Sequence, residues 1–225
     1  MRKTIGFFAL TAMTTTLFAA SKDEVNKRLD EAASVFSEIT ASPDKGIPQD
    51  LLEKAHCAVI VPGMKKGAFI IGAQYGKGFL TCRTTGGGWS APAAIKMEGG
   101  SVGFQIGGSE TDVVMLVMNE RGAQKLMESQ FTLGGDAEVA AGPVGRTTTA
   151  ETDAKFRAEM LSWSRSRGVF AGISLKGATL RADEEDNAAL YGRKLTSKEV
   201  INGKVAPDGA GRRLNDLLSK YAFRG

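Results

Sequence analysis

Short runs of strand-forming residues alternate with glycine-containing segments in the first half of the chain, and this pattern constrains the fold most. Residues 56–62, 68–75 and 79–83 are rich in apolar and β-branched side chains, and glycines border the segments between them. Strands joined by such short turns pair antiparallel with their neighbours along the chain. The pattern therefore predicts an antiparallel meander of three strands.

Apolar side chains recur at helical spacing near both ends of the chain. Residues 22–40 carry one apolar stripe, and a final helix is predicted to begin at Pro207 and Asp208. Shorter helices are predicted for residues 48–55, 119–128 and 183–191, and further strands for 93–97, 101–107, 112–118, 137–141, 156–165, 170–175 and 178–182. No linker or repeat divides the chain. We expect an α+β single domain with a largely antiparallel β-sheet core and N-terminal and C-terminal helices.

Residues 1–21 have the composition of a secretory signal peptide. Arg2 and Lys3 precede a weakly apolar run without charges, and three small residues stand just before Lys22. The apolar run falls short of the roughly 20 residues that a membrane-spanning helix needs. We therefore expect an exported protein, periplasmic or secreted, with a mature domain at residues 22–225.

The net charge of the chain is modest and unevenly distributed. The formal value is +4, and removal of the predicted signal peptide lowers it to +2. Residues 22–142 carry a net charge of −3, and residues 143–225 carry +5. So small a total does not favour nucleic acid as a partner. Any positive surface should draw on the C-terminal part.

The two cysteines, Cys57 and Cys82, could form a disulfide in an exported protein. In the predicted meander they lie on opposite sides of the middle strand, about 9.6 Å apart across two strand spacings. That separation exceeds the roughly 7 Å between Cα atoms that a disulfide tolerates. We predict two buried free thiols, and a different strand order would reverse this prediction.

The usual sequence patterns of catalytic and cofactor sites are missing. His56 is the only histidine, and its place beside a cysteine at the start of a strand favours a structural role. One histidine and two cysteines lack a fourth ligand and the local spacing of a zinc site. No phosphate-binding loop motif occurs, and the acidic run 183–186 is interpreted as a solvated helix start. We expect a non-enzymatic protein without metal or cofactor.

Several separated motifs follow one another in a recognisable order. They are Gly88-Trp89-Ser90-Ala91-Pro92, GFQIG at 103–107, DAEVAAGPVGR at 136–146, GVFAGISLKG at 168–177, and Tyr191-Gly192. This order resembles the SYLF domain family over nearly all of residues 22–225. The resemblance implies a lipid-binding module, since eukaryotic members bind phosphoinositides with the help of an N-terminal amphipathic helix. Yeast-type members also bind and bundle actin.

The expected export modifies what this resemblance implies. An exported chain does not meet cytosolic filaments, so actin, although a partner of family members, is not the partner that we expect here. For an exported bacterial-type member, anionic phospholipid or lipopolysaccharide phosphate would replace phosphoinositide headgroups. The predicted function is therefore peripheral binding of anionic membrane lipid, and the alternative is a periplasmic protein-interaction or envelope-assembly module.

Basic and aromatic side chains supply the candidate lipid-binding residues. Lys22 and Arg28 flank the apolar stripe of the first helix, where cations of an interfacial helix belong. Arg165 and Arg167 share one predicted strand face with a tryptophan, which suits a headgroup at a membrane interface. We place the main site on this strand face because five acids accompany the basic residues of the first helix. The full predicted set is Lys22, Arg28, Lys65, Lys66, Arg146, Trp163, Arg165 and Arg167.

Overall fold

The computed structural model describes residues 21–42, 46–68, 71–102, 107–128, 130–136, 138–142, 158–166, 169–170 and 175–222. Arg146, Arg167 and the predicted signal peptide, apart from Ser21, lie outside these residues. In the described ranges no helix has the length and apolar character to cross a membrane.

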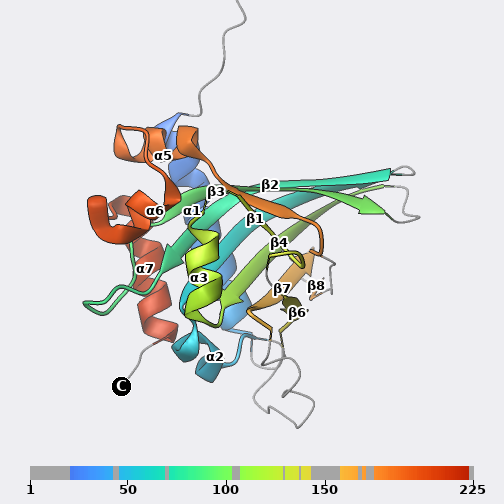
Figure 1. Cartoon of the computed structure of the whole chain (residues 1–225), viewed down its shortest axis with the longest axis horizontal. Helices are drawn as coiled ribbons and strands as arrows, with labels where there is room; N and C mark the ends of the chain where they lie inside the picture. The colour runs from blue at the N-terminus through green and yellow to red at the C-terminus, as the bar shows by residue number, and fades with distance from the viewer. Residues whose placement is uncertain are drawn as a thin grey trace, which may run out of the picture.

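A curled sheet forms the centre of the molecule (Figure 1). In the described part of the chain its nine strands are β1 Cys57–Ala68, β2 Ile71–Cys82, β3 Ala93–Val102, β4 Gly107–Val117, β5 Gln130–Thr132, β6 Val139–Ala141, β7 Met160–Ser166, β8 Val169–Phe170 and β9 Thr179–Ala182. The strand order is β5-β9-β3-β2-β1-β4-β7-β6, and β8 pairs with β7. Only the β6–β7 pair is parallel among these strands.

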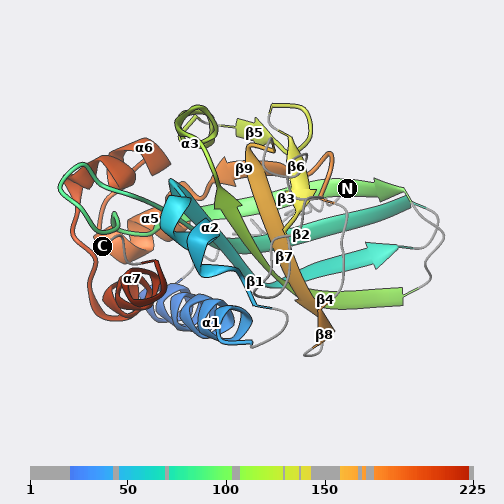
Figure 2. The ribbon, with the colours of Figure 1, turned by 90° about the horizontal axis from the view of Figure 1, so that it is seen from below.

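Helices cover the sheet near the chain ends, as predicted. They are α1 Lys22–Thr40, α2 Gln49–Lys54, α3 Glu120–Leu126, α5 Glu184–Tyr191, α6 Ser197–Glu199 with the π-helical turn η1 Val200–Lys204, and α7 Gly209–Tyr221. Ser21 and Glu24 form a capping box that begins α1 where the apolar stripe begins. Helices α1 and α7 lie side by side on one face of the sheet (Figure 2). The predicted α+β domain with terminal helices is confirmed.

Each face of the sheet has an apolar core of its own, because the side chains of a strand point alternately to opposite faces. On one face, Ile60 and Phe79 belong to the same buried cluster as Phe36 of α1. On the other face, Val59 and Leu80 are buried with residues of α3, β5 and η1. The central strands are therefore buried on both sides where helices and short strands cover them.

Strands β1 and β2 are much longer than predicted, and the three-stranded meander is wrong. Residues 63–67 and 76–78 lie inside the two strands instead of forming turns. Gly63 has a φ of 55° where the register of β1 shifts, a conformation that glycine adopts readily. At Gly78, a Cβ atom would lie 2.1 Å from the carbonyl oxygen of Ile60. These glycines permit a bend and a close approach of two strands.

The same error explains why the prediction of free thiols is wrong. Cys57 and Cys82 form a disulfide, and their Cα atoms are 3.9 Å apart. Because β1 pairs directly with β2, the two cysteines are partners in register at the base of one long hairpin. No strand separates them, so the distance argument against a disulfide does not apply.

The far ends of the four long strands extend beyond the helices (Figures 1 and 2). We call this part, residues 65–68, 71–75, 98–102 and 107–110, the distal sheet. Its flanks have few strand neighbours, because β7 pairs with β4 only from Asp112 onward and β9 pairs with β3 only up to Glu98. Tyr75 is 44% exposed here, and no other large apolar side chain of the described residues is exposed.

Candidate functional site

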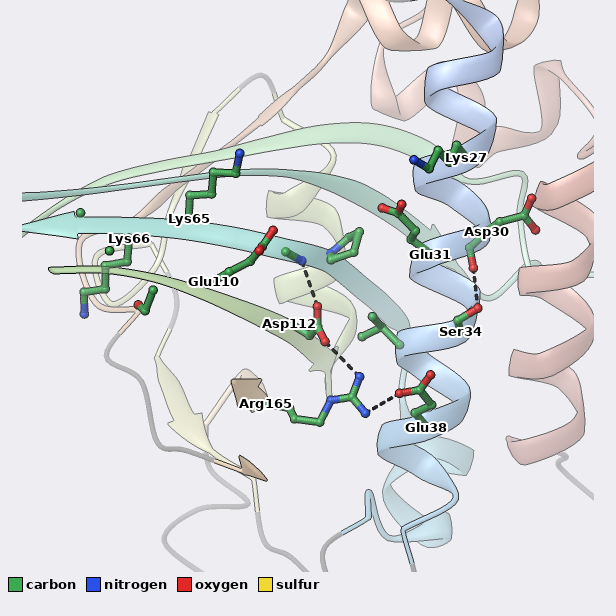
Figure 3. A pocket seen from close by; sticks show the side chains of 16 residues that line it. Lys27, Asp30, Glu31, Ser34, Glu38, Lys65, Lys66, Glu110, Asp112 and Arg165 are labelled. Atoms are coloured by element: carbon green, nitrogen blue, oxygen red, sulfur yellow. Dashed lines mark hydrogen bonds and ion pairs between the residues drawn. The ribbon is translucent and has the colours of Figure 1, made fainter. Parts of the chain in front are cut away.

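A groove of about 1090 Å³ lies between α1 and the distal sheet (Figure 3). The helix forms one wall, strands β1 and β4 form the floor, and β7 contributes Arg165 at one end. Its charged lining residues are Lys27, Asp30, Glu31, Glu38, Lys65, Lys66, Glu110, Asp112 and Arg165. Both signs of charge are present, so the groove is not simply a basic pocket.

The charges of the groove are arranged in levels along α1. Lys27 and Lys65 extend into the gap from the helix and from the sheet, and Glu31 and Glu110 form the next level (Figure 3). Lys65 and Glu110 are partners in register on β1 and β4. Lys27 and Glu31 are four residues apart, which places them on the same side of the helix. Within the described structure none of these four side chains forms a hydrogen bond or an ion pair.

Arg165 closes the inner end of the groove. Its guanidinium donates hydrogen bonds to Glu38 at 2.5 Å and to Asp112 at 3.0 Å. Asp112 also accepts a hydrogen bond from the backbone N–H of Gly63. Burial lowers the pKa of Arg165, but the hydrogen bonds to Glu38 and Asp112 outweigh burial and raise this pKa above its ordinary value. Arg165 thus joins β7 to β4 and α1, and both terminal nitrogens of its guanidinium are already engaged.

Trp163 lies in the core and not on an outer face of the sheet. It shares one face of β7 with Arg165, as predicted, but this face is turned toward α1. Only 3% of Trp163 is exposed. A Cβ atom at Gly142 would lie 2.2 Å from the indole ring, so the adjoining backbone is close to it. The expectation of an exposed aromatic beside the arginine is therefore corrected.

Arg28 belongs to a buried network of charges and does not face solvent as expected. Arg28 contacts Asp186 at 2.5 Å, and Lys77 of β2 contacts Asp183 at 2.7 Å and Asp186 at 3.0 Å. Both carboxylates are 1% exposed, so the acidic run before α5 is not wholly solvated. Burial raises the pKa of Asp183. The contact with Lys77 has the opposite and larger effect, so this pKa is below its ordinary value. The network joins α1, β2 and α5.

The remaining predicted residues differ in their surroundings. Lys22 forms an exposed ion pair of 3.4 Å with Asp208. Lys65 is exposed on the groove side of β1, whereas Lys66 points to the other side of the strand (Figure 3). Neither lysine has an ion-pair partner among the described residues. The structure therefore brings Lys65 and Arg165 to one groove and leaves Lys65 available there, whereas Lys66 lines the groove with its side chain turned away.

Sequence reasoning did not single out Lys27, Glu31, Glu110 or Tyr75. The four-residue spacing of Lys27 and Glu31 beside the apolar stripe of α1 was a usable signal. Glu110 and Tyr75 offered none, because their positions depend on the length and register of the strands. Tyr75 lies opposite Lys65 in β2, so the two share one face of the distal sheet.

The chain is a single α+β domain on a curled, mostly antiparallel sheet, with a charged groove beside its first helix. The chain belongs to the Ysc84 family, described as "Las17-binding protein actin regulator", whose model matches residues 98–221. This confirms the resemblance to the SYLF family. Domains of this family are generally non-catalytic.

Similarity to characterised proteins extends beyond the family model. The chain is 33% identical over 198 residues to "SH3 domain-containing YSC84-like protein 1" of Xenopus laevis, covering 85% of this chain and 59% of that protein. It is 34% identical over 183 residues to "LAS seventeen-binding protein 3" of Saccharomyces cerevisiae, covering 80% of this chain and 40% of that protein. The chain thus spans about half the length of the curated relatives that it matches.

Proposed function

We propose that this chain is an exported, non-enzymatic lipid-binding domain that docks on anionic membrane surfaces through its distal sheet. The observation that carries the proposal is the position of Lys65 and Lys66. Both are without ion-pair partners in the described structure. Lys65 lies beside exposed Tyr75 where the helices leave the sheet uncovered, and Lys66 extends from the other side of the same strand. The other described members of the predicted set are buried or paired.

The chemistry of this surface suits a lipid headgroup region. Tyrosine has an apolar ring and a polar tip, and it is enriched where proteins meet the membrane interface. Each basic residue near an anionic membrane contributes about 1 kcal/mol to binding. On the same face, Glu98 and Glu110 are the register partners of Tyr75 and Lys65, and the next positions toward the strand ends are exposed Gly67, Ala73 and Gly108. Because Gly67, Ala73 and Gly108 have little or no side chain, a membrane surface can approach the backbone closely at the strand ends.

The disulfide supports the proposed location outside the cytoplasm. Disulfides persist in oxidising compartments such as the periplasm and are rare in the cytosol. The Cys57–Cys82 bond lies in the folded core of the hairpin base, where Cys57 is fully buried. Together with the predicted signal peptide, this favours a periplasmic or secreted protein that is peripheral to a membrane.

Flotation with vesicles tests the proposed function. We expect the purified chain to float with phosphatidylcholine vesicles that contain phosphatidylglycerol and to be released by salt, because the Debye length falls from about 10 Å at 0.1 M to about 3 Å at 1 M. Binding should increase with the phosphatidylglycerol content. Absence from every vesicle fraction, at low salt and with anionic lipid, would contradict the proposal.

The alternative function is binding of a protein partner, in a periplasmic interaction or envelope-assembly module. The family description favours it, because that description names binding of Las17 and regulation of actin. A protein-binding module would ignore vesicles and copurify with a specific protein, and sedimentation with purified filaments tests actin separately. Vesicle flotation and copurification therefore separate the two functions.

A further inference from the structure

The groove beside α1 contains unpaired charges of both signs. Arg165, Glu38 and Asp112 neutralise one another at its inner end. The next two levels hold Lys27 with Lys65 and Glu31 with Glu110, and no ion pair joins any of these four within the described residues. A lysine that precedes a glutamate by four residues in a helix is in the weaker of the two orders for an ion pair. Two cations and two anions thus face the same space.

A purely anionic ligand satisfies only half of this arrangement. Its phosphate would gain from Lys27 and Lys65, but Glu31 and Glu110 in the next level would repel it. A ligand with both a phosphate and a primary ammonium matches both levels. Lysine ammonium groups donate hydrogen bonds to phosphate oxygens, and carboxylates accept the three N–H bonds of a ligand ammonium.

We propose that the groove binds the headgroup of an aminophospholipid, with its phosphate between Lys27 and Lys65 and its ammonium between Glu31 and Glu110. One helical turn advances about 5.4 Å, which is comparable to the two-carbon linker between phosphate and amine in phosphoethanolamine. The inference rests on the proposed lipid-binding function. Anionic lipid attracts the domain to the membrane, and the groove then selects the aminophospholipid headgroup.

The test keeps the surface charge constant and changes only the amine. Vesicles contain a fixed share of phosphatidylglycerol, and phosphatidylethanolamine replaces phosphatidylcholine stepwise. Choline carries no N–H donor, so only the ethanolamine headgroup offers hydrogen bonds to the two glutamates. We expect the affinity of the wild-type chain to rise about tenfold, the effect of a charge-assisted hydrogen bond of modest strength. Soluble phosphoethanolamine should compete better than inorganic phosphate.

Variants that neutralise the two glutamates should have opposite effects on the two kinds of vesicle. Glu31→Gln with Glu110→Gln should abolish the rise with phosphatidylethanolamine, yet strengthen binding to phosphatidylglycerol–phosphatidylcholine vesicles because repulsion is removed. Glu184→Gln with Glu185→Gln makes the same change in net charge at two exposed positions on α5 and should keep the rise. Thermal unfolding verifies that both variants fold.

Each outcome decides between the two proposals. Binding to phosphatidylglycerol vesicles without any gain from ethanolamine would overturn the headgroup inference and leave the proposed function intact. An equal loss of the gain in the α5 control would also overturn it. Failure to bind any vesicle would overturn both the inference and the function on which it rests.

Discussion

The four long strands β1 to β4 have one half that the helices cover and one uncovered half, the distal sheet. The two halves carry different residues on the face of the sheet that is turned toward α1. In the covered half, Ile60 and Phe79 are fully buried beneath the helices. In the distal sheet, the same face carries Lys65, Tyr75 and Glu110. In β1 the register shifts at Gly63, so the alternation resumes after a bulge, and the residue types change beyond it. The helical layer therefore ends where the strand sequence changes from apolar residues to charged and small ones.

The basic residues differ in the same way between the two halves. Arg28 and Arg165 lie where helices meet the sheet, and each contacts buried or half-buried carboxylates. Lys27 and Lys65 lie at the open groove and have no such partner in the described structure. The position of a cation relative to the helical layer, more than its residue type, decides whether it is free to bind a ligand.

The largest difference between the halves should appear in stability. Phe36 of α1 is fully buried, so Phe36→Ala should lower the free energy of unfolding by about 3 to 5 kcal/mol through lost burial and a cavity. Tyr75→Ala in the distal sheet should change it by less than about 0.5 kcal/mol. Urea unfolding measures both variants. Similar losses for the two would show that the distal sheet is packed as tightly as the covered half.

The disulfide should stabilise the covered half without contributing to binding. The bond closes a loop with a sequence separation of 25 residues. Closing this loop lowers the entropy of the unfolded chain, which corresponds to about 3.5 kcal/mol of stabilisation. We expect Cys57→Ala with Cys82→Ala to lose about this much stability, while vesicle binding of the folded fraction is retained. Unfolding curves of the oxidised wild type and the variant provide the comparison. A selective loss of binding at unchanged stability would contradict the assigned roles.

The buried charge network should make stability depend on pH in the covered half. Lys77→Met leaves buried Asp183 without its cation and should cost about 3 kcal/mol at neutral pH. Because the folded-state pKa of Asp183 is below its ordinary value, the stabilisation is present above pH about 4 and disappears as pH falls through the folded pKa. The hydrogen bonds to Asp183 and Asp186 outweigh burial and raise the pKa of Lys77, so the stabilisation is lost at high pH only above its ordinary value of 10.5.

Unfolding at neutral and acid pH measures this dependence. The difference between wild type and Lys77→Met should shrink toward acid, where the carboxylates are protonated in both proteins. A difference that stays constant from neutral pH to pH 3 would show that Lys77 stabilises by packing of its side chain and not by charge.

Charge reversal in the distal sheet should affect binding and leave stability unchanged. Lys65→Glu with Lys66→Glu should weaken binding to anionic vesicles about 30-fold or more, since each basic residue contributes about 1 kcal/mol and reversal adds repulsion. Lys194→Glu with Lys198→Glu makes the same charge change at exposed positions away from the groove. Flotation compares the two variants. An equal loss in both would indicate a general effect of net charge instead of a local site.

Local patterns predicted the helices well because their signals lie within a few residues. The apolar stripe of residues 22–40 and the short helices predicted for 119–128 and 183–191 correspond to α1, α3 and α5 of the structure. The glycines within β1 and β2 appeared to mark turns, since no local signal distinguishes a glycine in a turn from one that lets two strands approach closely. The missed disulfide follows from this single error in strand length.

The candidate site was predicted less well because its decisive contacts join distant segments. Arg165 pairs with Glu38 at a sequence separation of 127 residues, and Arg28 pairs with Asp186 at 158. No pattern within one segment indicates such pairs. Lys65 and Lys66 remain candidates because neither forms an ion pair within the described part of the chain, although the sequence interpretation gave them no priority over Arg165 and Arg167.

Site-specific fluorescence tests most directly whether the distal sheet is the surface that contacts the membrane. The disulfide occupies both native cysteines, so an environment-sensitive probe attaches selectively to Ala73→Cys on the distal sheet or to Ser219→Cys on α7, both exposed positions. With anionic vesicles, we predict a blue-shifted, brighter emission from the probe at position 73 and unchanged emission at position 219. A shift at position 219 with none at position 73 would contradict the account and place the membrane contact on the helices.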